Sequence, residues 1–177
     1  MARYKDSTRD WIYISDEDAR KVIENAAPQW RLPILILYHY GLRASEVMYL
    51  RPENLKDNTL VIQRLKGGKL TKQIIVPEIA ELAELAKRTP VGCRIFNFGG
   101  KTPRVMLWWH IQRAGNRASV DRVFLHPHAF RHRCGRRWAR LGTPHELMAM
   151  MGHRTMNASL MYTQLSCDEQ LSRKFLG

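Results

Sequence analysis

The chain has 177 residues, and its 29 Lys and Arg against 16 Asp and Glu give a formal net charge of +13 at pH 7. Hydrophobic residues form 45% of the composition, which suffices for one buried core and excludes a mainly disordered chain. The longest apolar run, Ile34 to Tyr38, is too short to cross a membrane, and the polar N-terminus does not resemble a secretory signal. A pI near 10.2 makes a polyanion the expected partner.

The cysteines indicate the compartment. Cys93, Cys134 and Cys167 are widely spaced and include no CxxC pair. Three such residues favour a reducing cytoplasm over a disulfide framework, and they predict neither a zinc site nor any other metal site. With the basic charge, this leads us to expect a cytoplasmic protein associated with the nucleoid, and no membrane partner.

Caps and prolines predict three helices in the first part of the chain, over residues 15–27, 31–40 and 44–50. Residues 1–14 are expected to be an arm or linker. Ser15 can cap the first helix, and Gly41 can end the second in a left-handed conformation. Because Ile34–Leu37 is apolar on every side, the second helix is expected at the centre of the core.

The middle of the chain is expected to form a small sheet. The runs Thr59–Ile62 and Gln73–Val76 are rich in β-branched residues and flank Lys66-Gly67-Gly68-Lys69, which predicts an antiparallel hairpin. Arg94–Phe96 is a candidate third strand. Apolar residues at helical spacing predict a helix over Glu78–Lys87.

The second half of the chain is predicted to be helical. The expected helices are Thr102–Arg117, His128–Leu141, Pro144–Met151, Asn157–Gln164 and Asp168–Phe175. The tryptophans Trp108, Trp109 and Trp138 are expected in the core. The fold class is therefore mainly α with a small antiparallel β-sheet, in one domain over residues 15–165 followed by a tail over 166–177.

Residues 122–140 hold six arginines, three histidines and no carboxylate. So dense a block of positive charge favours a partner that carries phosphates, and arginine suits bidentate phosphate contacts. Helical periodicity puts Arg133 and Arg137 on one side of the predicted helix, and Arg136 and Arg140 on another. We expect at least one of these pairs to contact DNA.

Five short motifs occur in a characteristic order. They are Tyr40-Gly-Leu-Arg-Ala-Ser-Glu46, Gly68-Lys-Leu-Thr-Lys-Gln-Ile-Ile-Val-Pro77, His128-Ala-Phe-Arg-His132, Met151-Gly-His153 and Tyr162-Thr163. Each is weak alone, since a tyrosine beside Leu160 and Met161 is ordinarily a packing residue. Together the motifs resemble the catalytic domain of the tyrosine recombinase (integrase) family, which includes the Xer recombinases and lambda-like integrases, over residues 10–170.

The resemblance implies the DNA breaking-rejoining fold and a transesterification at a DNA phosphodiester. Tyr162 would be the nucleophile and would form a 3′-phosphotyrosine with release of a 5′-hydroxyl, without a metal or other cofactor. Arg43 and Arg131 would hold the non-bridging phosphate oxygens, because guanidinium groups stay charged and offer a fork of donors. His153 would donate a further hydrogen bond to the phosphate.

Two protons must move in this reaction. His128 is the candidate to accept or orient the proton of the Tyr162 hydroxyl. A hairpin lysine of the family protonates the leaving oxygen; Lys69 fits the spacing to Pro77, and Lys66 is the alternative. Glu46 lies three residues after Arg43, so its carboxylate can brace a cation of the site.

The expected partner is double-stranded DNA, bound by a tetramer of a protein that is monomeric when free, with accessory DNA-bending proteins as further candidates. The tail over residues 166–177 would either dock on a neighbouring protomer or fold back on its own chain. Candidate DNA-binding residues outside the catalytic set are Lys66, Arg133, Arg136, Arg137 and Arg154.

Some features depart from the family pattern. Gly135 lies inside a predicted helix, where glycine costs about 1 kcal/mol. Only about ten residues precede the catalytic region, so the chain is either an excised catalytic domain or a short recombinase like the fimbrial inversion enzymes. The alternative functions are a type IB topoisomerase and a catalytically silent DNA-binding module. A covalent protein–DNA adduct would exclude the silent module, and relaxation of supercoils without site dependence would favour the topoisomerase.

Overall fold

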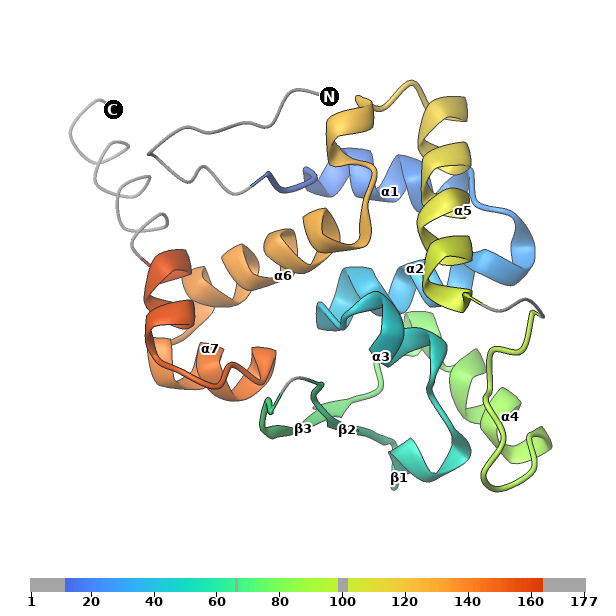
Figure 1. Cartoon of the computed structure of the whole chain (residues 1–177), viewed down its shortest axis with the longest axis horizontal. Helices are drawn as coiled ribbons and strands as arrows, with labels where there is room; N and C mark the ends of the chain where they lie inside the picture. The colour runs from blue at the N-terminus through green and yellow to red at the C-terminus, as the bar shows by residue number, and fades with distance from the viewer. Residues whose placement is uncertain (1–11, 66, 99–101, 164–177) are drawn as a thin grey trace.

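Helix α2 (Pro28–Tyr40) runs through the centre of the protein. The computed structural model describes residues 12–65, 67–98 and 102–163. Around α2 lie α1 (Asp16–Glu24), α3 (Ala44–Met48), α5 (Pro103–Arg117) and α6 (Pro127–Leu141), all in contact with it (Figure 1). The side chains of Ile34–Leu37 are all buried, as the apolar run predicted.

The predicted helix ends are largely confirmed. The Ser15 side chain accepts a hydrogen bond from the backbone N–H of Asp18 (3.0 Å) and caps α1, and Ile14 just before it is buried in the core. Gly41 ends α2 at φ 55°, in the left-handed region. Helix α2 begins at Pro28, three residues earlier than predicted, because proline suits a first helical turn whose N–H needs no partner.

The sheet has the strand order β1-β2-β3 and is antiparallel. Its strands are β1 (Leu55–Lys56), β2 (Thr59–Gln63) and β3 (Leu70–Ile74), with Gln63 opposite Leu70. The hairpin is therefore as predicted, but β3 begins three residues earlier. The prediction of a strand at Arg94–Phe96 was wrong. The third strand is β1, since Asp57 and Asn58 both adopt positive φ and make a tight turn into β2.

The second half of the described chain is helical, as predicted. It contains α5, α6, α7 (Pro144–Met151) and a helical segment at 157–163, and α4 (Glu81–Arg88) precedes them. Single turns of 3-10 helix lie at Pro52–Asn54, Pro77–Ile79 and Arg122–Phe124. The helix expected at 168–175 and the tail lie outside the described residues. Over the described ranges, we find no helix with the length and apolar character of a membrane-spanning segment.

The tryptophan prediction was wrong for two residues. Trp108 and Trp109 are 40% and 44% exposed, because α5 turns Leu107, Ile111 and Ala114 toward the core instead. Trp138 is partly buried. Cys93 and Cys134 are free thiols, the first exposed and the second buried.

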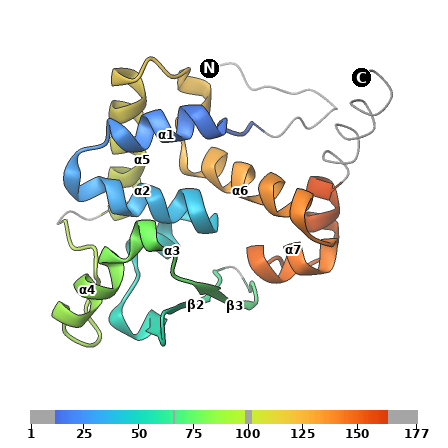
Figure 2. The same cartoon turned by 180° about the vertical axis from the view of Figure 1, so that it is seen from behind.

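A second, smaller core joins α6, α7 and the segment 157–163. Its buried members are Cys134, Ala139, Leu147, Met151 and Tyr162. Helix α7 also contacts β3, so this end of the molecule brings the hairpin, α6 and α7 together (Figure 2). Tyr162 therefore lies where three segments distant in sequence meet.

Gly152 ends α7 at φ 61°, and a Cβ there would lie 2.3 Å from Cγ of Arg64. We expect Gly152→Ala to lower the free energy of unfolding by about 3 kcal/mol, from left-handed strain and overpacking together. Urea denaturation measures this loss. Gly92→Ala is the matched control, because Gly92 has φ 81° but open space around it, so strain alone should cost about 1–2 kcal/mol. Equal losses in the two variants would contradict the close contact at Arg64.

Candidate active site

Arg131 joins two helix ends from its place on α6. It is only 5% exposed, and its guanidinium donates to the backbone oxygens of Gly41 and Met151, the latter at 3.0 Å. Both carbonyls lie at helix C-termini, where the helix dipole favours a cation. Burial, with smaller effects of Arg64 and Arg43, lowers the pKa of Arg131 to about 10, so it remains charged at neutral pH.

Arg43 and Glu46 form a pair at the start of α3. Nη1 of Arg43 donates to Oε1 of Glu46 at 2.8 Å, and the backbone N–H of Arg43 donates to Oε2 at 2.8 Å. Burial would raise the pKa of Glu46, but the Arg43 N–H and the Arg64 charge outweigh it and hold that pKa below its usual value. The buried carboxylate thus braces Arg43, whose side chain is 25% exposed.

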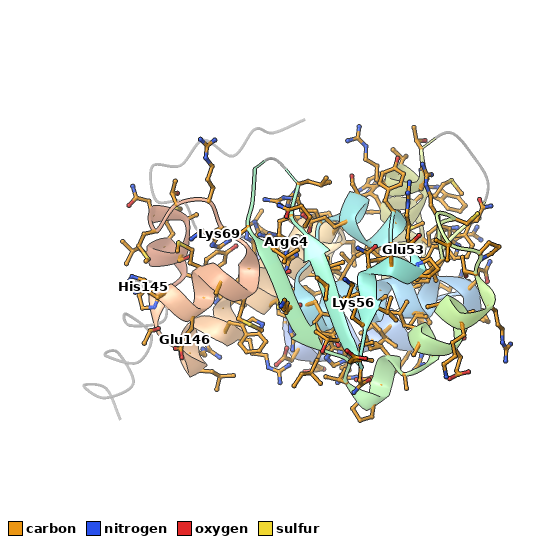
Figure 3. The ribbon with its side chains drawn as sticks, turned by 90° about the horizontal axis from the view of Figure 1, so that it is seen from below. Glu53, Lys56, Arg64, Lys69, His145 and Glu146 are labelled. Atoms are coloured by element: carbon orange, nitrogen blue, oxygen red, sulfur yellow. The ribbon has the colours of Figure 1, made fainter. Side chains whose placement is uncertain are left out.

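Arg64, which the sequence analysis missed, lies beside this pair. Its side chain is fully buried, and it donates from Nη1 to Oε2 of Glu46, from Nε to Oγ1 of Thr71 and from Nη2 to the backbone oxygen of Met150, each at 3.0 Å. Figure 3 labels it on the hairpin. The alternation that buries Leu60 and Ile62 on β2 continues to Arg64, and this signal could have revealed it.

Tyr162 is 2% exposed, but its hydroxyl meets a polar partner. The hydroxyl oxygen lies 2.9 Å from Nδ1 of His132, and the ring stacks on His153 with centroids 5.7 Å apart. A Cβ on Gly135 would lie 2.5 Å from the tyrosine ring, which explains why glycine occurs inside α6. Burial raises the pKa of Tyr162, while the charges of Arg131 and Arg43 oppose the rise.

The structure hydrogen-bonds the tyrosine to a different histidine from the one predicted. The sequence assigned His128 to the hydroxyl, whereas the hydrogen bond at 2.9 Å is to His132. His128 is exposed in the first turn of α6, and its ring is stacked 6.1 Å from that of His132. Burial, with His128 and Arg131, lowers the pKa of His132 to about 4, so its ring is neutral and one of its two nitrogens can accept a hydrogen bond.

His153 follows Gly152 and is 8% exposed. Its Nδ1 lies 2.9 Å from Oγ of Ser159, which is fully buried on the segment 157–163. Burial lowers the pKa of His153 to about 4, with smaller effects of Arg131, Arg43 and Arg64. Structure therefore brings Arg43, Arg131, His153 and Tyr162 to one place, as the motifs predicted.

The two low histidine pKa values predict a loss of stability in mild acid. Between about pH 6.5 and 4 the unfolded chain binds protons on His132 and His153 that the folded protein does not, so the free energy of unfolding falls as pH decreases. We expect a lower urea midpoint at pH 5.5 than at pH 7.5. His153→Gln should weaken this dependence by about one proton, and an unchanged dependence would contradict burial of a neutral His153.

Of the two candidate lysines, the structure describes Lys69. Lys69 is exposed at the start of β3, and its backbone oxygen accepts a hydrogen bond from the Arg64 N–H (3.4 Å); Figure 3 labels both residues. Lys66 lies outside the described residues. Arg154 is exposed, and its Cδ is near the hairpin glycine Gly67.

The remaining arginines of α6 lie together on another face. Arg133, Arg136, Arg137 and Arg140, which the sequence analysis divided into two pairs, all line one cleft of about 430 Å³ with residues 13–16. By helical periodicity these four residues are turned about 120–180° away from Arg131. Arg133 is 5% exposed, packs on the Tyr38 ring at 3.6 Å and pairs with Asp16, so little of its side chain is available for the predicted DNA contact. Arg136 stacks on Tyr13 at 4.0 Å.

The described residues contain no group of three His, Cys, Asp or Glu side chains placed to hold a metal ion. What they contain is a cluster of guanidiniums and imidazoles around a tyrosine. Residues 12–169 match the sequence model of the phage integrase family. The chain belongs to this family.

The integrase relatives include the type 1 fimbriae regulatory protein FimB of Escherichia coli K12, 31% identical over 78% of this chain and 74% of FimB. Tyrosine recombinase XerD of Ralstonia nicotianae is 27% identical over 77% of this chain, and here the chain spans 48% of the relative. The predicted family and enzyme class, a tyrosine-type site-specific recombinase, are thus confirmed at the level of the family.

Solved structures confirm the predicted fold. A crystal structure of XerA recombinase matches with a TM-score of 0.72 and 18% identity. The match covers 93% of this chain and 65% of the XerA chain. XerH bound to palindromic difH substrate after cleavage has a TM-score of 0.71 and 22% identity, over 92% of this chain and 52% of XerH. The catalytic domain of bacteriophage HP1 integrase has a TM-score of 0.63 and 19% identity, over 86% of both chains.

Proposed function

We propose that this chain is the catalytic domain of a site-specific recombinase that cuts and rejoins DNA through a 3′-phosphotyrosine on Tyr162. The phenolic oxygen attacks the phosphorus of a DNA phosphodiester, the O–P bond forms, and the bond to the 5′ oxygen breaks. A 5′-hydroxyl of another strand then reverses the step. The observation that supports this proposal most strongly is the stacking of Tyr162 on His153 beside the charges of Arg43 and Arg131.

Arg43 and Arg131 form the phosphate clamp. Their positive charges balance the negative charge on the non-bridging oxygens. A guanidinium has five N–H donors, and backbone oxygens hold two of those of Arg131 in place, so the others can bind phosphate without reorganisation. Arg43, Arg64 and Arg131 supply three positive charges against one carboxylate, Glu46. This surplus of two charges suits a phosphoryl group that gains negative charge as it is attacked.

Proton transfer uses residues on either side of the phosphate. His132, whose Nδ1 lies within hydrogen-bond distance, orients the Tyr162 hydroxyl and takes its proton as the O–P bond forms. The hairpin lysine, Lys69 with Lys66 as the alternative, donates a proton to the leaving 5′ oxygen. His153 donates from Nε2 to the phosphate, with its ring oriented by Ser159. Lys69 and Arg154 on the exposed hairpin side contact the DNA backbone.

The partner in this proposal is double-stranded DNA, and the acting form is a tetramer assembled on two duplexes from monomers in the cytoplasm, at the nucleoid. The net charge of +13 and the basic site support a polyanionic partner. DNA-bending accessory proteins would assist assembly of the tetramer.

Covalent capture tests the proposed function and identifies the DNA probe at the same time. The chain is incubated with a library of nicked duplexes with a randomised centre, in which the released strand diffuses away and traps the adduct. Denaturing purification and sequencing recover the site, and peptide mass analysis should locate the nucleotide on Tyr162. Absence of any covalent species across the library, or attachment at another residue, would overturn the proposal.

Binding to the recovered duplex should weaken steeply with salt. Each neutralised phosphate contributes about 0.9 to the slope of log K against log salt, so about six contacts lower affinity on the order of 10³-fold between roughly 50 and 200 mM. Fluorescence anisotropy with a labelled duplex measures this slope. A flat response would show that the basic surface does not bind the DNA backbone.

A further inference from the structure

Arg64 contributes positive charge to the site, but the reaction as proposed does not explain why its buried guanidinium is bonded in three directions. We propose that Arg64 is a positioning residue: it sets the place of the hairpin lysine relative to the phosphate clamp, so that the leaving oxygen receives its proton. This inference rests on the proposed function and adds a residue to it.

On one side, Arg64 shapes the hairpin. Its N–H donates to the backbone oxygen of Lys69, and its Nε donates to Thr71 on β3. A Cβ on Gly68 would lie 2.6 Å from Cβ of Arg64 and 2.7 Å from the backbone oxygen of Gly152, so the hairpin backbone lies directly on both. The hairpin backbone at Gly68 and Lys69 therefore lies against Arg64.

On the other side, Arg64 is connected to each arginine of the clamp through one intervening group. Nη1 of Arg64 binds Oε2 of Glu46, and Oε1 of the same carboxylate binds Arg43. Nη2 binds the backbone oxygen of Met150, and the next carbonyl, that of Met151, accepts from Arg131. One planar guanidinium thus links the hairpin to both members of the clamp, and Leu65 next to it adds direct hydrogen bonds to Arg43 and Glu46.

The shape of the guanidinium matters for this role. Lysine would keep the positive charge, but a single ammonium cannot hold Glu46, Thr71 and Met150 in the fixed fork geometry that arginine provides. A role limited to charge would affect every stage of phosphate chemistry, whereas a role in placing the lysine affects the departure of the 5′ oxygen. The two roles can be separated by the leaving group.

The experiment compares two nicked duplexes of the captured sequence, one with the normal 5′ bridging oxygen and one with sulfur there. With sulfur, the phenolic O–P bond forms, the P–S bond breaks and the strand leaves as a thiolate, which needs no proton because a thiol has a pKa of only about 8.5. In Arg64→Met, adduct formation should slow strongly on the oxygen duplex and much less on the sulfur duplex. The sulfur-to-oxygen rate ratio should rise on the order of 10-fold or more over the unsubstituted chain.

Lys69→Ala and Lys66→Ala show which lysine protonates the leaving oxygen, because loss of that lysine should raise the sulfur-to-oxygen rate ratio in the same way. Arg133→Met is the matched control, since Arg133 is also a buried, bonded arginine but lies away from the hairpin, so its rate ratio should stay that of the unsubstituted chain. Arg64→Lys should raise the ratio less than Arg64→Met. If Arg64→Met does not fold, Thr71→Val, which removes the acceptor of Nε together with the long hydrogen bond from the hydroxyl to the backbone oxygen of Ile62, is measured in the same way.

An unchanged ratio in folded Arg64→Met, or in Thr71→Val where that variant decides, would overturn the positioning role. A chain without substitutions that forms no adduct on either duplex would contradict the proposed function itself. The two failures are therefore distinguishable in one set of measurements.

Discussion

Replacement of Tyr162 by phenylalanine is expected to abolish the covalent protein–DNA adduct completely. The proposed intermediate is a phosphate ester of the phenolic oxygen. Without that atom the ester cannot form, so no residual rate is expected. Folding should persist, because the lost hydrogen bond to His132 contributes only about 1 kcal/mol and the ring keeps its packing on Gly135 and His153. Denaturing gels measure the adduct, and anisotropy measures the retained DNA binding.

Tyr40→Phe is the matched control for this variant. Tyr40 is 3% exposed, and its hydroxyl donates to the backbone oxygen of Ile74 and accepts from the N–H of Val76, so the substitution also removes buried hydrogen bonds. We expect this variant to form the adduct with a slower rate at most. An adduct that survives in Tyr162→Phe would assign the nucleophile to another residue.

The proposed nucleophile, Tyr162, is buried. The Tyr162 hydroxyl is held in the second core, yet its neighbours are imidazoles and guanidiniums rather than aliphatic groups alone. A low-dielectric setting strengthens every interaction with the clamp, but it also raises the pKa of the phenol.

The fold could be predicted to a large extent from local signals. The apolar run Ile34–Leu37 predicted the central helix, and Ser15 and Gly41 predicted helix ends, because these features act over a few residues. The third strand was mispredicted, since β1 has only two residues and depends on the positive φ of Asp57 and Asn58. Pairing so short is decided by a turn rather than by strand propensity.

The residues of the site were predictable only where the spacing of the motifs indicated them. Arg43, Arg131, His153 and Tyr162 were found by spacing, but the choice between His128 and His132 depends on which face of α6 meets Tyr162. Arg64 was missed because its partners, Glu46, Thr71 and Met150, are brought to it by tertiary packing. The burial of Arg133 was not predictable for the same reason, since nothing in a basic block of sequence shows that one of its arginines is bonded to Tyr38 and Asp16.

Arg131→Lys tests the clamp while keeping its charge. One ammonium cannot hold the carbonyls of Gly41 and Met151 and also offer a fork of donors to a phosphate, so we expect adduct formation to slow on the order of 10²–10³-fold. The loss should appear in the rate at saturating DNA more than in affinity, because the clamp stabilises charge that develops during attack. It should also persist on the sulfur-containing duplex, unlike the loss in Arg64→Met.

Arg133→Lys separates this effect from the cost of changing a buried arginine. The two residues lie two positions apart on α6 and are equally exposed at 5%, but on different faces of the helix. If the clamp depends on guanidinium geometry at the phosphate, only Arg131→Lys loses the chemical step, whereas both variants lose stability in urea. Comparable cleavage by the two lysine variants would mean that charge alone suffices at Arg131 and that the guanidinium fork contributes nothing to the reaction.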